Sequence, residues 1–192
     1  MIIWITGVSA SGKSTVCYKV LDELGIGYKN INDRIPYHSF GDIITVGRYS
    51  QAGKTLNGLD GVMVSKDRLQ RFIDKQHKSY RHILIEGNKF LTKEFIDHLL
   101  KYELKIFHLN TNLNEVLIRS SKRSNGYDKR ITLKERKNQF KKYEELYNKP
   151  KYKSYIEVRE NLNIKETHKV AKEILELLKP INNIVGTLKN FL

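Results

Sequence analysis

The sequence has little cysteine and no long apolar run, and both absences exclude classes of protein. Its single cysteine, Cys17, cannot form an internal disulfide and cannot by itself build a zinc cluster. No apolar run approaches the roughly eighteen residues that cross a bilayer. The N-terminal MIIWITGVSASGK is apolar but carries no basic leader and no cleavage site, so we expect it to be part of the fold rather than a signal peptide. These features predict a protein of the reducing cytoplasm, with no membrane partner.

Acidic residues are also scarce relative to basic ones. The chain has 35 Lys and Arg against 21 Asp and Glu, a formal net charge of +14. Between Arg119 and Lys153 there are 13 basic and four acidic residues, so this segment alone carries a net charge of +9. Such a concentration favours a polyanionic partner, with nucleic acid as the first candidate. A solvated helix face in a lysine-rich chain is the alternative.

The 192 residues fit one domain and show neither an internal repeat nor a low-complexity linker. Short apolar runs alternate with helical patterns, which predicts an α/β fold with a parallel sheet flanked by helices. Strands are expected at 2–6, 28–32, 42–46 (a strand or a hairpin arm), 82–86, 105–110 and 154–159. Helices are expected at 13–24, 66–78, 93–101, 112–123, 132–149 and 164–179, the last two ended by Pro150 and Pro180.

Residues 7–14 read Gly-Val-Ser-Ala-Ser-Gly-Lys-Ser, the full G-x-x-x-x-G-K-[ST] pattern, between an expected strand and an expected helix. Gly7 and Gly12 allow backbone angles that turn successive N–H groups toward a phosphate, and the helix N-terminus adds partial positive charge. Lys13 is expected to contact the terminal phosphates and Ser14 to bind Mg²⁺. The pattern predicts ATP or GTP binding by Gly7, Ser9, Ala10, Ser11, Gly12, Lys13, Ser14 and Thr15.

A second Gly-Lys-Thr occurs in GRYSQAGKT, residues 47–55, but it lacks the required spacing. Five residues rather than four separate Gly47 from Gly53, and the following TLNGLDG does not favour a helix. Without a helix N-terminus there is no second phosphate-binding loop. Residues 41–61 instead form a glycine-rich loop of the kind that binds a ligand near an active site, or else a plain surface loop.

Carboxylates and a cation are expected at the same sheet edge as the loop. Glu86 ends an apolar strand, so its carboxylate should emerge beside the loop, where it could hold a magnesium-bound water or activate an acceptor. Asp33 follows another strand and could accept a proton from an acceptor hydroxyl, or could serve only as a turn or helix-capping residue. Arg34 beside it could bind an acceptor phosphate.

Arg119 and Arg123 lie four residues apart on an expected helix and so face the same way. Because Ser-Asn-Gly follows them, they suit a lid that closes over the transferring phosphate. Tyr127, Lys129 and Arg130 extend this basic strip and could contact a nucleic-acid backbone. A solvated basic face is the alternative.

The chain resembles the P-loop kinases of the nucleotide and polynucleotide kinase group over roughly residues 1–178. The resemblance rests on GVSASGKST, on IEG at a strand end and on RSSKRSNG before a basic helix. It implies a P-loop NTPase fold with a five-stranded parallel sheet, a mobile helical lid over about residues 119–150, and use of ATP with Mg²⁺. The catalytic residues are then expected to be Lys13, Asp33, Glu86, Arg119 and Arg123, with Ser14 and Glu86 at the metal.

Two narrower resemblances concern the acceptor. NINDR is similar to a stretch of polynucleotide kinases in which the aspartate deprotonates the attacking hydroxyl, which implies Asp33. Residues 47–65, GRYSQAGKTLNGLDGVMVS, resemble a segment of bacteriophage hydroxymethyluracil DNA kinases, with LDGVMVS departing from the expected pattern. This second resemblance implies an acceptor-binding segment at about 41–65. The matching positions are Tyr49, Gly58, Asp60 and Ser65.

The sequence therefore leaves three functions open. The first is phosphorylation of the hydroxymethyl group of 5-hydroxymethyl-deoxyuridine in phage DNA, in the host cytoplasm, with Tyr49 offering a stacking face for an extruded base. The second is a deoxynucleoside monophosphate or polynucleotide kinase, in which Arg34, Arg48 or Arg68 binds the acceptor phosphate. The third is a nucleic-acid-binding module that ATP switches without chemistry. The substrate-binding residues expected for the first are Arg34, Arg48, Tyr49 and Asp60.

Overall fold

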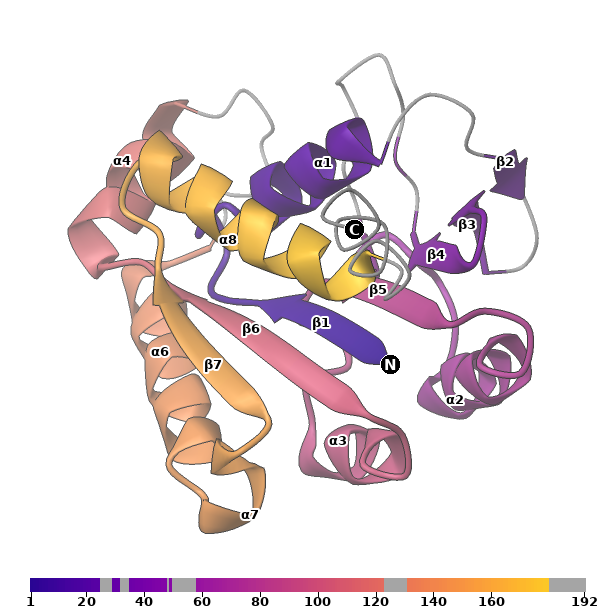
Figure 1. Cartoon of the computed structure of the whole chain (residues 1–192). Helices are drawn as coiled ribbons and strands as arrows, with labels where there is room; N and C mark the ends of the chain where they lie inside the picture. Colours follow the sequence, from indigo (N-terminus) through magenta and orange to yellow (C-terminus); the bar gives the residue numbers. More distant parts are fainter. Residues whose placement is uncertain (25–28, 32–34, 48, 50–57, 123–130, 180–192) are drawn as a thin grey trace, which may run out of the picture.

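A seven-stranded sheet in the order β2-β3-β4-β5-β1-β6-β7 organises the described part of the chain (Figure 1). The computed structural model describes residues 1–24, 29–31, 35–47, 49, 58–122 and 131–179. The strands are β1 (Ile2–Thr6), β2 (Lys29–Ile31), β3 (Tyr37–Phe40), β4 (Ile43–Val46), β5 (His82–Glu86), β6 (Leu104–Asn110) and β7 (Ile156–Glu160). The helices are α1 (Lys13–Glu23), α2 (Lys66–Gln76), α3 (Lys93–Leu99), α4 (Leu113–Lys122), α6 (Leu133–Tyr147), α7 (Pro150–Lys153) and α8 (Ile164–Leu178).

Five neighbouring strands, β4-β5-β1-β6-β7, run parallel and form the expected five-stranded core of the sheet. Two antiparallel strands, β3 and β2, extend it at one edge. Strand β3 was not predicted from the sequence. A half-buried strand alternates apolar and polar residues, whereas YHSF has two consecutive polar residues, His38 and Ser39. It pairs with β4 across a tight turn at Gly41, whose φ is 60°.

The central strands β1 and β5 are buried along their whole length, and because successive side chains point to opposite faces, both faces of the sheet are covered. Ile2 and Trp4 of β1 face a core that α2, α3 and α6 cover. Ile3 and Ile5 face a second core that α1 and α8 cover. Figure 1 shows α1 and α8 side by side on that second face. Among the described helices, none has both the length and the apolarity needed to span a bilayer.

The segment expected as a lid divides into two parts. Helix α4 ends at Lys122, and α6 begins at Leu133 with Thr132 as its N-cap, whose side chain accepts from the N–H of Glu135. The second half of α6 belongs to the core, where Tyr143, Leu146 and Tyr147 are buried. Pro150 opens α7 at its first turn instead of directly ending α6, a position at which proline's missing N–H costs nothing.

Candidate functional site

The loop between β1 and α1 has the backbone that a phosphate-binding loop requires. Gly7, Ala10 and Gly12 all have positive φ, at 146°, 67° and 93°. Gly12 must also be small, because a Cβ there would lie 2.5 Å from Nδ2 of Asn161. The structure therefore confirms the expected conformation of this glycine-bounded loop.

Polar groups inside the loop suit an anion. The Lys13 Nζ donates to the carbonyl oxygens of Gly7 (2.9 Å) and Val8 (3.0 Å), which holds the cation over the loop. The hydroxyl of Ser11 is buried and has no hydrogen-bond partner within the described residues. A buried hydroxyl without a partner is unfavourable, so an acceptor oxygen placed in the loop would satisfy it. These residues fit the phosphates of a nucleotide.

Glu86 and Ser14 lie together at the mouth of the loop. The Ser14 hydroxyl donates to Oε1 of Glu86 at 3.3 Å, and Glu86 is only 2% exposed. Magnesium prefers oxygen ligands and is typically held by one or two protein groups together with waters and substrate phosphates. In the described part of the chain no cluster of three or more His, Cys, Asp or Glu forms. The donor set therefore fits a magnesium ion shared with a nucleotide rather than one enclosed by protein.

The end of the predicted acceptor-binding segment packs directly against Glu86. The N–H of Leu59 donates to the backbone oxygen of Glu86 at 2.7 Å. A Cβ on Gly58, whose φ is 33°, would lie 2.1 Å from Oε2 of the same glutamate, so only glycine fits. Asp60 accepts from the N–H groups of Asn88 (2.8 Å) and Lys89 (2.9 Å) through one oxygen. Residues 58–60 are thus packed against the end of β5.

Three side chains hold the rear of the phosphate-binding loop through one carbonyl. The backbone oxygen of Ser11 accepts from Nδ2 of Asn161 (2.6 Å), Nη1 of Arg119 (3.2 Å) and Oγ1 of Thr111 (3.3 Å). Arg119 also donates to the Asn161 carbonyl at 2.8 Å and to Glu115 at 2.8 Å. All three guanidinium nitrogens are engaged with the chain. The observed place of Arg119 is therefore behind the loop, and its closure over a phosphate stays a prediction.

Helix α6 brings a second arginine to the loop. Arg136 is 2% exposed, and its Nη1 donates to the carbonyl oxygen of Ser9 at 3.5 Å. A guanidinium is rarely buried unless it is paired or hydrogen-bonded. Its burial beside the loop adds positive charge where a nucleotide's terminal phosphates would bind.

Three buried polar side chains, those of Thr6, His108 and Tyr147, join α6 to the sheet beside the loop. The Tyr147 hydroxyl and Nδ1 of His108 are 2.5 Å apart, and Oγ1 of Thr6 lies 3.2 Å from both atoms. Burial, and secondarily the charge of Lys13, lowers the pKa of His108 to about 3. Burial likewise raises the pKa of the Tyr147 phenol. His108 is therefore neutral at pH 7, and Thr6, the last residue before the loop, is tied to α6.

The remaining expected residues differ in their outcome. Tyr49 is 7% exposed and packs with the core under α1, its ring 5.8 Å from that of His38. Because the ring is covered, it offers no stacking face to an extruded base, and this part of the sequence interpretation is corrected. Ser65 is the N-cap of α2. The other expected residues, Asp33, Arg34, Arg48 and Arg123, lie outside the described residues.

Sequence reasoning missed several residues that contact the loop. Asn88 exchanges hydrogen bonds with the backbone of Gly7, and Asn161 supports Ser11. Both follow the ends of parallel strands, so the rule that identified Glu86 could have found them. Arg136 repeats with Phe140, Tyr143 and Tyr147 at i, i+4, i+7 and i+11, a spacing that indicated one inward helix face.

Comparisons with known proteins agree with this geometry at the level of the fold. Neither a protein-family model nor a curated protein matches the sequence. A sugar kinase from Janibacter sp. HTCC2649 superposes with a TM-score of 0.53 at 17% identity, over 92% of this chain and 93% of the other. A deoxyadenosine kinase from M. mycoides with dCMP and dCDP bound superposes with a TM-score of 0.51 at 17% identity, over 96% and 100%. The chain shares the fold of these two kinases, an α/β fold with a mostly parallel sheet flanked by helices. At such identities the likeness extends to the fold and no further.

Proposed function

We propose that the chain is an ATP-dependent kinase, a phosphotransferase that moves the γ-phosphoryl group to an acceptor hydroxyl. One observation carries the proposal. Glu86 contacts Ser14 of the phosphate-binding loop through its side chain, and Gly58 and Leu59 of the predicted acceptor segment pack against the same glutamate. This contact supports a site in which the nucleotide and the acceptor bind on either side of one buried carboxylate, as phosphoryl transfer requires.

Each residue has a defined task in this reaction. The loop amides and the Lys13 cation hold the β- and γ-phosphates, and Arg136 adds positive charge beside them. The acceptor oxygen forms a bond to the γ-phosphorus while the bond to the β–γ bridging oxygen breaks, so ADP leaves. The acceptor proton passes to a carboxylate, either Glu86 or the predicted Asp33. Magnesium, when bound, neutralises charge on the β- and γ-phosphates, and Ser14 and Glu86 would hold it.

For the acceptor, we propose the hydroxymethyl group of 5-hydroxymethyl-deoxyuridine within DNA. Its support is the resemblance of residues 47–65 to bacteriophage hydroxymethyluracil DNA kinases, the packing of Gly58 and Leu59 against Glu86, and the formal net charge of +14 of the chain. A DNA acceptor supplies many phosphates to that charge.

A small acceptor is the second candidate, and a specific observation favours it. The fold is shared with a deoxyadenosine kinase whose structure holds dCMP and dCDP. In addition, the buried Tyr49 ring removes one support for base extrusion. On this alternative the protein phosphorylates a deoxynucleoside or its monophosphate.

An acceptor screen with γ-labelled ATP distinguishes these functions. The acceptors are DNA containing 5-hydroxymethyluracil, the same DNA with thymine, free deoxynucleosides and their monophosphates, and the control enzyme is Lys13→Ala. Label in the hydroxymethyluracil DNA alone supports the DNA acceptor, and label only in free nucleosides or monophosphates replaces it with the second candidate. Absence of transfer to every acceptor would reject a kinase and favour an ATP-switched binding module.

A further inference from the structure

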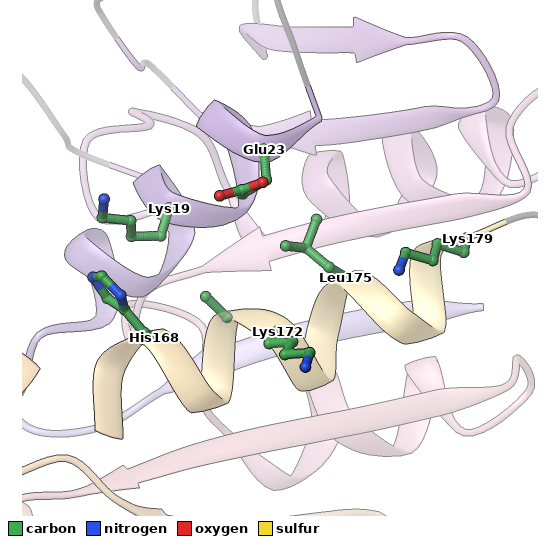
Figure 2. A pocket seen from close by; sticks show the side chains of 7 residues that line it. Lys19, Glu23, His168, Lys172, Leu175 and Lys179 are labelled. Carbon is green, nitrogen blue, oxygen red and sulfur yellow. The ribbon is translucent and has the colours of Figure 1, made fainter. Parts of the chain in front are cut away.

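A groove lies between helices α1 and α8, and none of the residues that line it belongs to the phosphate-binding loop, residues 7–14. It encloses about 420 Å³, and apolar surface from Ala171 and Leu175 contributes to its lining. Figure 2 shows Lys19 and His168 at one end of the groove and Lys179 at the other, with Leu175 between them. Lys19 lies on the second half of α1, six residues beyond Lys13. The groove is therefore formed by the outer surfaces of two helices whose inner surfaces fill the core.

The charge of the groove is mainly positive and is not neutralised by the described protein. Three lysines and one histidine line it, against the single carboxylate of Glu23. Elsewhere on the surface several lysines are paired, as Lys101 is with Asp74 and Lys151 with Asp97. Within the described residues, no side chain forms an ion pair with Lys19, Lys172 or Lys179. Lysines that line one groove and form no ion pair among the described residues attract an anionic ligand.

The spacing of these cations selects a long anion over a short one. Lys172 and Lys179 lie seven residues apart along α8 and its C-cap, which at 1.5 Å per residue is about 10 Å. One phosphate can meet only one end of such a row. A strand with a phosphate on every nucleotide can meet all of it, while its sugars contact Ala171 and Leu175.

We propose that the α1–α8 groove binds the sugar–phosphate backbone of a single nucleic-acid strand. The inference rests on the nucleic-acid acceptor proposed above, since it gives that acceptor a second contact outside the catalytic site. It differs from the sequence expectation, which assigned nucleic-acid contact to the basic segment 119–153. The observation behind the change is that α1 and α8 form a groove, whereas the lysines of α6 lie on an exposed helix face.

The test is binding of a fluorescein-labelled 20-nucleotide DNA strand by anisotropy, without ATP, across a series of KCl concentrations. The groove variant is Lys172→Ala/Lys179→Ala, and the matched control is Lys137→Ala/Lys141→Ala on the exposed face of α6. Each lost phosphate contact lowers the salt slope of a single strand by about 0.7, so the groove variant should lose about 1.4 in slope and roughly tenfold or more in affinity at 0.1 M salt. The four lysines are on exposed or rim positions, and thermal unfolding checks that both variants fold.

Two outcomes would overturn the proposal. One is a groove variant that binds the strand with wild-type affinity and slope. The other is an equal loss in both double variants, which would indicate a general charge effect. Because binding is measured without ATP, it does not depend on phosphoryl transfer. Failure of the kinase proposal would therefore appear in the acceptor screen and not in this measurement.

Discussion

Two regions of the molecule meet at the phosphate-binding loop, and they differ in how they are built. One is the pair of strand ends, where β1 leads into residues 7–14 and β5 ends at Glu86. The other is helix α6, which begins more than a hundred residues later and reaches the loop through Arg136 and Tyr147. The first contributes mainly backbone amides and the hydrogen-bonded pair Ser14 and Glu86. The second contributes long side chains from a helix that also fills the core.

This difference explains why only the strand-end region could be predicted from the sequence. A phosphate-binding loop requires particular local backbone angles. Glycines at a fixed spacing in the sequence predict those angles, because glycine adopts them without strain. The inward face of α6 depends on which surface the helix presents to the sheet, which is a property of the tertiary structure. The sequence analysis counted Arg136 only as one of the 13 basic residues between Arg119 and Lys153.

The largest expected effect belongs to the strand-end region. Glu86→Gln keeps the shape and burial of the side chain but removes its charge, so both metal binding and proton acceptance are lost. Turnover should fall by at least about 10²-fold, the range expected for general acid–base or metal roles. Steady-state kinetics with a saturating acceptor measures it. Turnover near the wild-type rate would remove Glu86 from the mechanism and leave Asp33 as the carboxylate in question.

Much of the fold could be predicted from the sequence, because its elements have clear periodicity. The apolar runs of β1, β5 and β6 and the expected helices all appear, with ends shifted by a few residues. Strand β3 was missed, since its pairing with β4 rather than its own composition makes it a strand. For the site, Glu86 was placed correctly beside Ser14, whereas the ring of Tyr49, expected to stack on a base, is buried in the core. Arg119 contacts the backbone of Ser11, and its expected closure over a phosphate stays a prediction.

A smaller effect is expected from the α6 region. Arg136→Ala removes a guanidinium beside the loop, and a hydrogen bond to a charged group contributes about 1.5–3 kcal/mol, so kcat/KM should fall roughly 10- to 100-fold. Lys137→Ala, one residue away and exposed, is the matched control and should retain full activity. Thermal unfolding of both variants separates lost chemistry from lost packing. Equal activity in the two variants would show that α6 supports the loop without contributing charge to it.

The smallest effect concerns His108, which contacts Thr6 of the strand-end region and Tyr147 of α6. It is measured as a change in the free energy of unfolding. His108 is neutral in the folded protein because burial lowers its pKa from 6.5 to about 3. Its contribution to stability is therefore complete above pH 6.5 and is lost as the pH falls toward 3, since the unfolded chain binds the proton first. The loss is about 1.4 kcal/mol per pH unit in that window.

The variant that isolates this effect is His108→Gln, which keeps a hydrogen-bond acceptor for Tyr147 and Thr6 but does not titrate there. Urea unfolding at pH 7 and pH 5 should show the wild type losing about 2 kcal/mol more than the variant. His82, whose pKa burial and Arg81 lower to about 4, is present in both proteins and cancels. An equal loss in both would mean that His108 accepts a proton without releasing α6. In that case the apolar core alone would join the loop to α6, and the contacts among Thr6, His108 and Tyr147 would not couple them.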